Sequence, residues 1–223
     1  RQDWQAKGQG ECTTMMRMDE FTKEIFTSQL NVSRETLDLF LLYAEILAKW
    51  QAKINLISGN TIDNVLSRHF LDSAQLYDLV PRGAKTVLDI GSGAGFPGMV
   101  LAVMGVKNVT LVEADSRKCL FLSEVLRQTG THANIVNCRI EEFDGGCYDI
   151  ITARALAPMD KLLAYINPHF GPSTKGIFLK GEQVDRELTK AKKQWKLDYK
   201  TVQSITNDSG SIIVVEKITS GTE

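Results

Sequence analysis

Residues 87–98 read VLDIGSGAGFPG, which places four glycines within eight positions directly after a short apolar run. Glycine weakens regular structure, so such a cluster indicates a tight turn or a close approach of the backbone to a ligand. A glycine-rich loop after a buried strand is typical of ligand sites at the carboxyl end of the first strand in doubly wound sheets. Pro97 suits the first turn of a following helix. The stretch therefore predicts a strand, a ligand-binding loop and a helix.

Two kinds of ligand fit this loop. The dinucleotide pattern G-x-G-x-x-G is matched by Gly93, Gly95 and Gly98. The D-x-G-x-G pattern of S-adenosylmethionine sites is matched by Asp89 with Gly91, Gly93 and Gly95. Asp89 stands where dinucleotide folds usually have an apolar residue, and a carboxylate there can face the ammonium group of a methionine moiety. Glu113 ends the next apolar run and suits ribose hydroxyls in either ligand. We favour S-adenosylmethionine and keep a dinucleotide, or a turn without a ligand, as the alternatives.

After Pro81, short apolar runs alternate with helical stretches. Strands are predicted at 85–90, 108–114, 133–137, 148–154 and 175–180, and helices at 97–105, 117–130, 158–167 and 185–196. Two last strands, 199–205 and 211–218, flank the turn sequence NDSG. This alternation predicts an α/β fold with a mostly parallel, doubly wound, Rossmann-like sheet and a terminal antiparallel hairpin. Five βα units followed by a hairpin is the order of class I S-adenosylmethionine-dependent methyltransferases.

The first eighty residues have a helical pattern instead. A short helix is expected at 18–30, and Ser33 is a plausible N-cap for a helix that runs to Trp50 with an apolar stripe. Another amphipathic helix is expected at 61–80. Residues 1–17 lack any periodicity and are expected to be poorly ordered. We therefore predict a tail at 1–17, a helical extension at 18–80 packed on the main domain, and a methyltransferase domain at 81–223.

Composition narrows the function classes. Apolar residues make up 43% and charged residues 24%, and no apolar run approaches the ~18 residues of a membrane span. Four cysteines without a CxxC pair argue against a disulfide framework or a zinc site, so we expect a cytoplasmic protein without a metal. The net charge of −1 means that any RNA binding must use a local basic patch. Nothing in the sequence indicates an oligomer.

Several segments together are similar to one family. They are NLIS (55–58), RHFLDS (68–73), VLDIGSGAGFPG (87–98), EADSRKCLFL (113–122), CRIEEF (138–143), ARALAP (153–158) and LKG (179–181). From about Asp19 to Ile218 the chain resembles the bacterial ribosomal small-subunit RNA guanine-N7 methyltransferases, RsmG, formerly called GidB. The resemblance implies methyl transfer from S-adenosylmethionine to N7 of one guanine in 16S ribosomal RNA within the small subunit, guanine 527. The alternatives are a methyltransferase acting on another RNA or a small molecule, a dinucleotide-dependent oxidoreductase, and a non-catalytic ribosome-assembly factor.

The resemblance also implies roles for individual residues. Gly91 and Phe96 are expected to contact the cofactor, Ile140 and Glu141 to lie against its adenine, and Arg154 to lie at its edge near the substrate. The candidates for orienting the substrate are Arg154, His69, Lys180, Arg139 and Asn55. The candidates for binding RNA are Arg117, Lys118, Lys190 and Lys193, of which the last two belong to a basic run that is usually a solvated helix face. The family often has an arginine before the last strand, but here the stretch is DSGSIIVV (208–215).

The chemistry of N7 explains which groups the sequence lacks. Guanine N7 carries a lone pair and no proton, so its methylation needs alignment and desolvation but no general base. The N/D-P-P-Y/F motif of amino-group methyltransferases is absent where ARALAP stands, and no Pro-Cys pair marks a cysteine nucleophile. We expect no catalytic base. The guanidinium of Arg154 suits hydrogen bonds to guanine O6 or to a phosphate.

Overall fold

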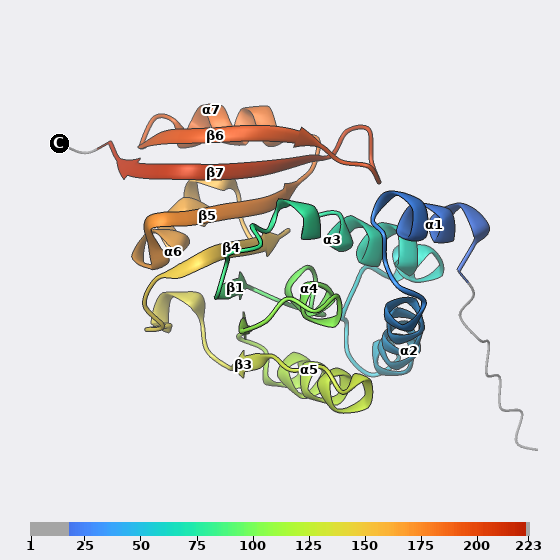
Figure 1. Cartoon of the computed structure of the whole chain (residues 1–223). Helices are drawn as coiled ribbons and strands as arrows, with labels where there is room; N and C mark the ends of the chain where they lie inside the picture. The colour runs from blue at the N-terminus through green and yellow to red at the C-terminus, as the bar shows by residue number, and fades with distance from the viewer. Residues whose placement is uncertain (1–17, 222–223) are drawn as a thin grey trace, which may run out of the picture.

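The computed structural model describes residues 18–221, so the predicted tail at 1–17 lies outside the described residues. Its centre is a seven-stranded sheet in the order β3-β2-β1-β4-β5-β7-β6 (Figure 1). The strands are β1 (Val87–Ile90), β2 (Val109–Val112), β3 (Asn134–Val136), β4 (Tyr148–Arg154), β5 (Phe170–Lys180), β6 (Trp195–Gln203) and β7 (Ser211–Ser220). The first five are parallel, and β7 is antiparallel to both β5 and β6. The predicted fold class is confirmed, and the inserted antiparallel β7 differs from the 3-2-1-4-5-6 order of dinucleotide-binding folds.

Helices cover both faces of the sheet because the strands are apolar on both sides. One face is covered by α4 (Gly98–Val103) and α5 (Ser116–Thr129), and the other by α6 (Met159–Ile166) and α7 (Val184–Ala191) (Figure 1). Val87 belongs to the core under α4 and α5, whereas Leu88 and Ile90 belong to the core under α6 and α7. This alternation follows from the two-residue period of a strand. The carboxyl ends of β1, β2 and β4 lie beside the glycine loop.

The helical extension packs onto the α4–α5 face. It comprises α1 (Glu20–Glu24), a π-helical turn (Ile25–Gln29), α2 (Arg34–Gln51), a 3-10 helix (Gly59–Asn64), a second π-helical turn (Leu66–Leu71), α3 (Asp72–Ala74) and a 3-10 turn (Tyr77–Leu79). The N-cap of α2 is confirmed, because Ser33 accepts the Thr36 N–H. Tyr43 of α2 stacks on Phe96 of the glycine loop at 5.7 Å and donates a hydrogen bond to the carbonyl of Ala94. The extension therefore fixes the back of the loop.

Two predicted helices differ from the structure. The helix expected at 61–80 is broken into short turns, and the hydroxyls of Ser67 and Ser73 bond back to the carbonyls of Asn64 and His69. Such bonds compete with regular helix geometry. The helix expected at 185–196 ends at Ala191, because Trp195 already pairs with Ser220 in the sheet. Strand pairing overrides the helical propensity of that segment. Small 3-10 turns also occur at Ile140–Glu142 and Asn167–His169.

Candidate functional site

The glycine loop adopts a backbone that only glycine takes easily. Gly91, Gly93 and Gly95 have φ angles of 63°, 57° and 89°, all in the left-handed region. A Cβ on Gly91 would lie 2.4 Å from Leu156 Cδ1, so the loop also needs its small size. The Gly93 N–H donates to Glu113 Oε2 at 2.7 Å, which joins the loop to the end of β2. The loop and Glu113 thus form one rigid unit.

Two of the predicted cofactor residues face the protein interior. A Cβ on Gly95 would lie 2.2 Å from the hydroxyl oxygen of Tyr43, so Gly95 makes room for the helical extension. Asp89 is fully buried, its Oδ1 accepts the Thr152 hydroxyl at 2.7 Å, and burial raises its pKa to about 6. Neither residue lines the three hollows described below. Both residues pack behind the loop in this structure, and their contact with the cofactor stays a prediction.

The first hollow, of about 350 Å³, lies over the carboxyl ends of β1 and β2. We call it the Glu113 hollow. Its walls are Gly91, Gly93, Val112, Glu113, Ala114, Lys118, Cys138, Arg139, Ile140, Glu141, Arg154, Ala155, Leu156 and Tyr165. The structure therefore brings Glu113, Ile140 and Glu141 together in one hollow. Glu113 is only 8% exposed and also accepts the Asp115 N–H at 2.8 Å, so its carboxylate is held in place.

Two further hollows adjoin the first. The His69 hollow, of about 490 Å³, lies between the glycine loop and the helical extension and includes Ser58, Thr61, His69, Phe96 and Lys118. The Lys180 hollow, of about 450 Å³, lies beyond β4 and includes Pro158, Lys180, Glu187, Ser204 and Asn207. Arg154 and Ala155 line all three hollows. The end of β4 is therefore the point where the three hollows meet.

Arg154 is held on several sides. Its Nη2 lies 2.6 Å from His69 Nδ1, and its Nη1 lies 3.4 Å from Asp72 Oδ2. Its guanidinium carbon lies 4.8 Å from the centre of the Phe96 ring, within the range of a cation–π contact. The side chain is 16% exposed. These contacts fix the guanidinium at the junction of the three hollows.

His69 is a neutral acceptor in this arrangement. A guanidinium can only donate, so Nδ1 must accept from Arg154 and the ring proton must be on Nε2. Nε2 lies 2.9 Å from the Thr61 hydroxyl, which in turn donates to the carbonyl of Ser58 at 2.7 Å. Burial, together with the charge of Arg154, lowers the pKa of His69 to about 3. The chain Arg154–His69–Thr61 therefore orients the guanidinium without adding a second positive charge.

Lys180 supports the loop that follows β4. Its Nζ donates to the carbonyl of Ala157 at 2.7 Å and to Glu187 Oε2 at 2.8 Å, and the side chain is 8% exposed. Glu187 Oε2 also accepts the Met159 N–H at 3.0 Å. The Lys180–Glu187 pair therefore holds the backbone at Ala157 and Met159, on either side of Pro158, which lines the Lys180 hollow.

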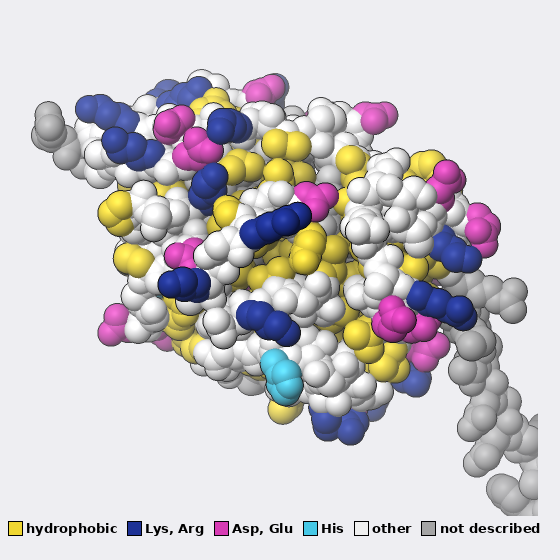
Figure 2. Space-filling view, viewed as in Figure 1, with side chains coloured by type: hydrophobic (Ala, Val, Ile, Leu, Met, Phe, Trp, Pro, Cys, Tyr) yellow, Lys and Arg dark blue, Asp and Glu magenta, His cyan; other side chains and the backbone are white. Residues whose placement is uncertain are grey.

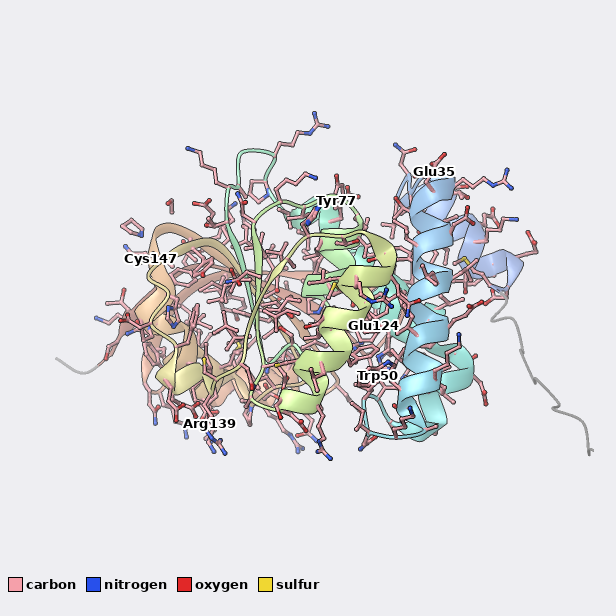
Figure 3. The ribbon with its side chains drawn as sticks, turned by 90° about the horizontal axis from the view of Figure 1, so that it is seen from below. Glu35, Trp50, Tyr77, Glu124, Arg139 and Cys147 are labelled. Carbon is pink, nitrogen blue, oxygen red and sulfur yellow. The ribbon has the colours of Figure 1, made fainter. Side chains whose placement is uncertain are left out.

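The remaining predicted residues are distributed unevenly. Lys118 lines both the Glu113 and His69 hollows, and the exposed Arg139 lines the Glu113 hollow. In Figure 3, Arg139 and Trp50 lie towards the lower edge of the view, whereas Tyr77 and Glu35 lie towards the upper edge. Trp50 is in the last turn of α2. The structure does not bring four other candidates into the hollows: Asn55, Arg117, Lys190 and Lys193.

Each of these four has a different setting. Asn55 is exposed, although its neighbours from Leu56 to Ser58 line the His69 hollow. Arg117 is paired with Asp115 at 2.9 Å, and Lys190 with Asp160 at 2.8 Å. Lys193 precedes β6, whose first residue pairs with Ser220, at the end of β7 far from Ser211. Lys193 therefore lies at the amino end of β5, away from Lys180.

Sequence reasoning missed the contact between the helical extension and the hairpin turn. The Thr206 hydroxyl donates to Asp72 Oδ1 at 2.7 Å, and the Ile205 N–H donates to Gln75 Oε1 at 2.9 Å. The segment RHFLDS (68–73), which is similar to the family, contains Asp72 and was the sequence signal for this residue. Its partner Thr206 is more than a hundred residues away in the chain. The hairpin turn thereby becomes a wall of the His69 and Lys180 hollows.

The donor set of the Glu113 hollow fits S-adenosylmethionine. Glu113 offers carboxylate oxygens for ribose hydroxyls, and Val112, Ile140 and Leu156 offer apolar walls for a purine. The glycine loop leaves the backbone accessible beside Gly93, where a Cβ would meet nothing closer than 3.8 Å. Within residues 18–221 there is no cluster of three or more His, Cys, Asp or Glu side chains able to hold a metal. No helix in the same part of the chain is long and apolar enough to cross a membrane.

Comparison with solved structures shows the fold. A methyltransferase from Pyrococcus furiosus has a TM-score of 0.55 and 17% identity, over 81% of this chain and 97% of that one. A TehB-like SAM-dependent methyltransferase from Corynebacterium glutamicum has a TM-score of 0.54 and 17% identity, over 79% and 98% of the two chains. The chain therefore has the class I methyltransferase fold that its strand order indicates.

Comparison of sequences shows the family. The profile of the family described as rRNA small subunit methyltransferase G (GidB) matches residues 36–213. The ribosomal RNA small subunit methyltransferase G of Paramagnetospirillum magneticum is 47% identical over 89% of this chain and 97% of its own length. That of Parvibaculum lavamentivorans is 46% identical over 86% and 88% of the two chains. The chain belongs to the rRNA small subunit methyltransferase G family.

Proposed function

We propose that this protein transfers a methyl group from S-adenosylmethionine to N7 of guanine 527 in 16S ribosomal RNA, acting on the small ribosomal subunit in the cytoplasm. Family membership and the fold support the methyl donor and the RNA substrate. The observation that carries the proposal is the junction at Arg154 and Ala155, where the hollow suited to the donor opens into two others. A methyl acceptor held in one of the other two hollows can therefore reach a methyl donor in the Glu113 hollow across this junction.

The protein groups at the junction suit an acceptor that needs no deprotonation. His69 is an obvious base by residue type, but its Nδ1 accepts from Arg154 and its Nε2 proton is directed at Thr61. Asp72 is similarly occupied by Arg154 and Thr206. Guanine N7 has a lone pair and no proton, so orientation and exclusion of water suffice. The site thus favours N7 over an amino group or a hydroxyl.

In this proposal some residues of the hollows bind the cofactor and others bind the RNA. Glu113 would hold the ribose hydroxyls of the cofactor, and Ile140 and Glu141 would contact its adenine. When bound, the cofactor supplies an electrophilic methyl on a sulfonium, which becomes a neutral thioether as the N7–carbon bond forms. Arg154 donates to the acceptor side, where guanine O6 and phosphate oxygens are acceptors. Lys118 and Arg139 lie at the rim and contribute positive charge towards the RNA.

The test uses S-adenosylmethionine with a labelled methyl group. The protein is incubated with small subunits from cells that lack this modification and, in parallel, with protein-free 16S RNA. The RNA is digested, the labelled nucleoside identified, and its position mapped. We expect labelled 7-methylguanosine at guanine 527 and no label when that base is replaced. Label at another guanine, in another nucleoside, or in neither RNA would contradict the proposal.

A pair of arginine variants sharpens the test. Arg154→Ala removes the guanidinium at the junction, whereas Arg117→Ala removes an exposed one that lines none of the three hollows. We expect the first to lower methyl transfer by at least about tenfold and the second to leave it near the wild-type rate. Binding of S-adenosylmethionine is measured separately. If Arg154→Ala weakened binding of S-adenosylmethionine while RNA binding and methyl transfer at saturating S-adenosylmethionine stayed at wild-type levels, its substrate role would be wrong.

A further inference from the structure

The Lys180 hollow lies on the side of the junction away from the glycine loop. It is formed by the segment 154–158, the end of β5, Glu187 of α7 and the hairpin turn, with Asp72 at one edge. None of the glycine-loop residues 91–96 lines it, whereas both other hollows include Gly91 and Gly93. Along the sheet the order β2, β1, β4, β5 places it beyond β4. The hollow is therefore open to a second molecule while the cofactor occupies the loop side.

The two carboxylates that line this hollow are in different states. Asp72 uses both oxygens: Oδ1 accepts from Thr206 and Gln75, and Oδ2 faces Arg154. Glu187 receives its two bonds, from Lys180 and the Met159 N–H, on Oε2 alone. Among residues 18–221, no hydrogen bond is made to Glu187 Oε1, and the side chain is 25% exposed. Glu187 thus presents a fixed, open acceptor to the hollow.

We propose that the Lys180 hollow holds the target guanine and that Glu187 recognises it, accepting the N1–H and the N2 amino group at Oε1. The inference rests on the proposed function, since it names the subsite of that same reaction. N7 and O6 share one edge of guanine, while N1 and N2 lie on the edge beyond O6. With N7 at the Arg154–Ala155 junction, O6 lies beside the Arg154 donors and the N1–N2 edge faces away from the cofactor. A carboxylate there complements guanine and opposes adenine, whose N1 is an acceptor.

Inosine isolates this contact, because it keeps N7, O6 and N1–H but lacks the N2 amino group. A 16S RNA is assembled by ligation with guanosine or inosine at the target position, and methyl transfer is compared as kcat/KM. The enzymes are wild type, Glu187→Gln and the control Glu182→Gln. Glu182 is exposed, lies near Lys180 and lines none of the three hollows. In Glu187→Gln the amide oxygen still accepts from Lys180 and from the Met159 N–H. The amide NH₂ then takes the place of Oε1 and faces the N1–H.

We expect wild type and Glu182→Gln to prefer guanosine RNA over inosine RNA by about tenfold, the size of one lost hydrogen bond to a carboxylate. In Glu187→Gln that ratio falls to about two, because both RNAs lose the N1–H contact and only guanosine RNA also loses the N2 contact. The ratio is taken on one enzyme preparation, so a partly unfolded variant lowers both rates equally and leaves it unchanged.

Two results would overturn the inference. One is a wild-type ratio near one, and the other is a Glu187→Gln ratio still near ten, each with 7-methylguanosine formed normally in guanosine RNA. Failure of the proposed function has a different signature, because wild type would then form no 7-methylguanosine at the target in guanosine RNA.

Discussion

His69 is neutral because a cation donates to it from one side and little water reaches it. Burial and Arg154 lower its pKa from 6.5 to about 3. Between these values the unfolded chain binds a proton on this residue and the native protein does not. The free energy of unfolding therefore falls as pH decreases below 6.5, and this loss continues towards pH 3.

The corresponding prediction compares wild type with His69→Asn, whose amide oxygen can still accept from Arg154 but cannot titrate. Urea unfolding at several pH values from 7.5 to about 5 should show a steeper loss of stability in the wild type. At pH 7.5 His69 is largely neutral in both the folded and the unfolded chain, so its titration adds nothing to the difference in stability between the two proteins. Parallel curves for the two proteins across this window would mean that His69 protonates in the native state at an ordinary pKa.

The Thr61 hydroxyl decides which nitrogen of His69 carries the proton. Thr61→Val removes the oxygen that receives the Nε2 proton, so the tautomer with a proton on Nδ1, facing Arg154, becomes accessible. We expect methyl transfer to fall by about fivefold, corresponding to ~1 kcal/mol for one hydrogen bond. Binding of S-adenosylmethionine should be unchanged, because Thr61 does not line the Glu113 hollow.

Ser67→Ala is the control for Thr61→Val. Its hydroxyl also bonds to a backbone carbonyl, that of Asn64, but not to the His69 ring. If both variants lost activity equally, the effect would come from the local turns and not from the histidine tautomer.

The sequence identified the chemistry of single residues better than their direction. Glu113 and Ile140 come after β2 and β3 and Arg154 ends β4, and all three line the Glu113 hollow because the carboxyl ends of parallel strands meet at one edge. Asp89 also lies near a strand end, yet the two-residue alternation turns it towards α4 and Thr152. Asn55 belongs to a matching segment, but only its neighbours turn inwards. Direction within a loop depends on contacts that a linear pattern does not contain.

At the scale of elements, Gly98 allows α4 to lie close to β1 and β2. A Cβ at this position would lie 2.5 Å from Asp89 Cβ and 2.6 Å from Leu111 Cδ2. Both neighbours are fully buried and cannot move aside. Gly98→Ala should therefore lower the free energy of unfolding by about 1–3 kcal/mol, the usual effect of overpacking. Gly83→Ala, where a Cβ meets no atom within 4 Å, is the matched control in urea unfolding. Equal stability of the two variants would contradict this packing argument.

Gln75 joins the helical extension to the hairpin turn. It accepts the Ile205 N–H and donates to Ser204 and to the carbonyl of Asp72, and it is 6% exposed. Gln75→Ala removes the acceptor of the Ile205 N–H and the buried bonds to Ser204 and Asp72, so we expect a loss of about 1–3 kcal/mol in urea unfolding. Gln128→Ala, an exposed residue bonded to Glu124, should change stability by less than about 0.5 kcal/mol. A Gln75→Ala protein as stable as the Gln128→Ala protein would show that the junction contributes little.

The order of elements was predictable, but two boundaries were not. Strand and helix periodicity located the seven strands in order, because the central ones are short apolar runs and β6 and β7 flank a turn sequence. The segment 185–196 has a helical composition throughout, yet its last residues lie in β6 because an edge of the sheet was available. The tie between Gln75 and Ile205 joins residues 130 positions apart, so no local pattern could reveal it.

At the scale of the whole molecule, the balance of charge requires RNA binding to be local. The net charge is −1, and on the face seen in Figure 2 the Lys and Arg side chains are interspersed with Asp and Glu. A uniform basic surface is therefore not the source of affinity. The walls of the Glu113 and His69 hollows carry Arg68, Lys118, Arg139 and Arg154 together with Glu113, Glu141 and Asp72. We expect Arg68, Lys118 and Arg139 to meet the phosphates nearest the target base.

Salt dependence separates this local patch from the basic run near the end of α7. Each phosphate contact releases counterions, so losing one Lys contact lowers the slope of log K against log salt concentration by about one. Lys118→Gln should show this smaller slope in filter binding of 16S RNA measured without cofactor. Lys193→Gln, at the amino end of β5, should keep the wild-type slope because it lies away from the hollows. If Lys193→Gln reduced the slope and Lys118→Gln did not, the RNA would bind across the amino ends of the parallel strands. The proposal that RNA phosphates contact the basic side chains of the hollows would then be wrong.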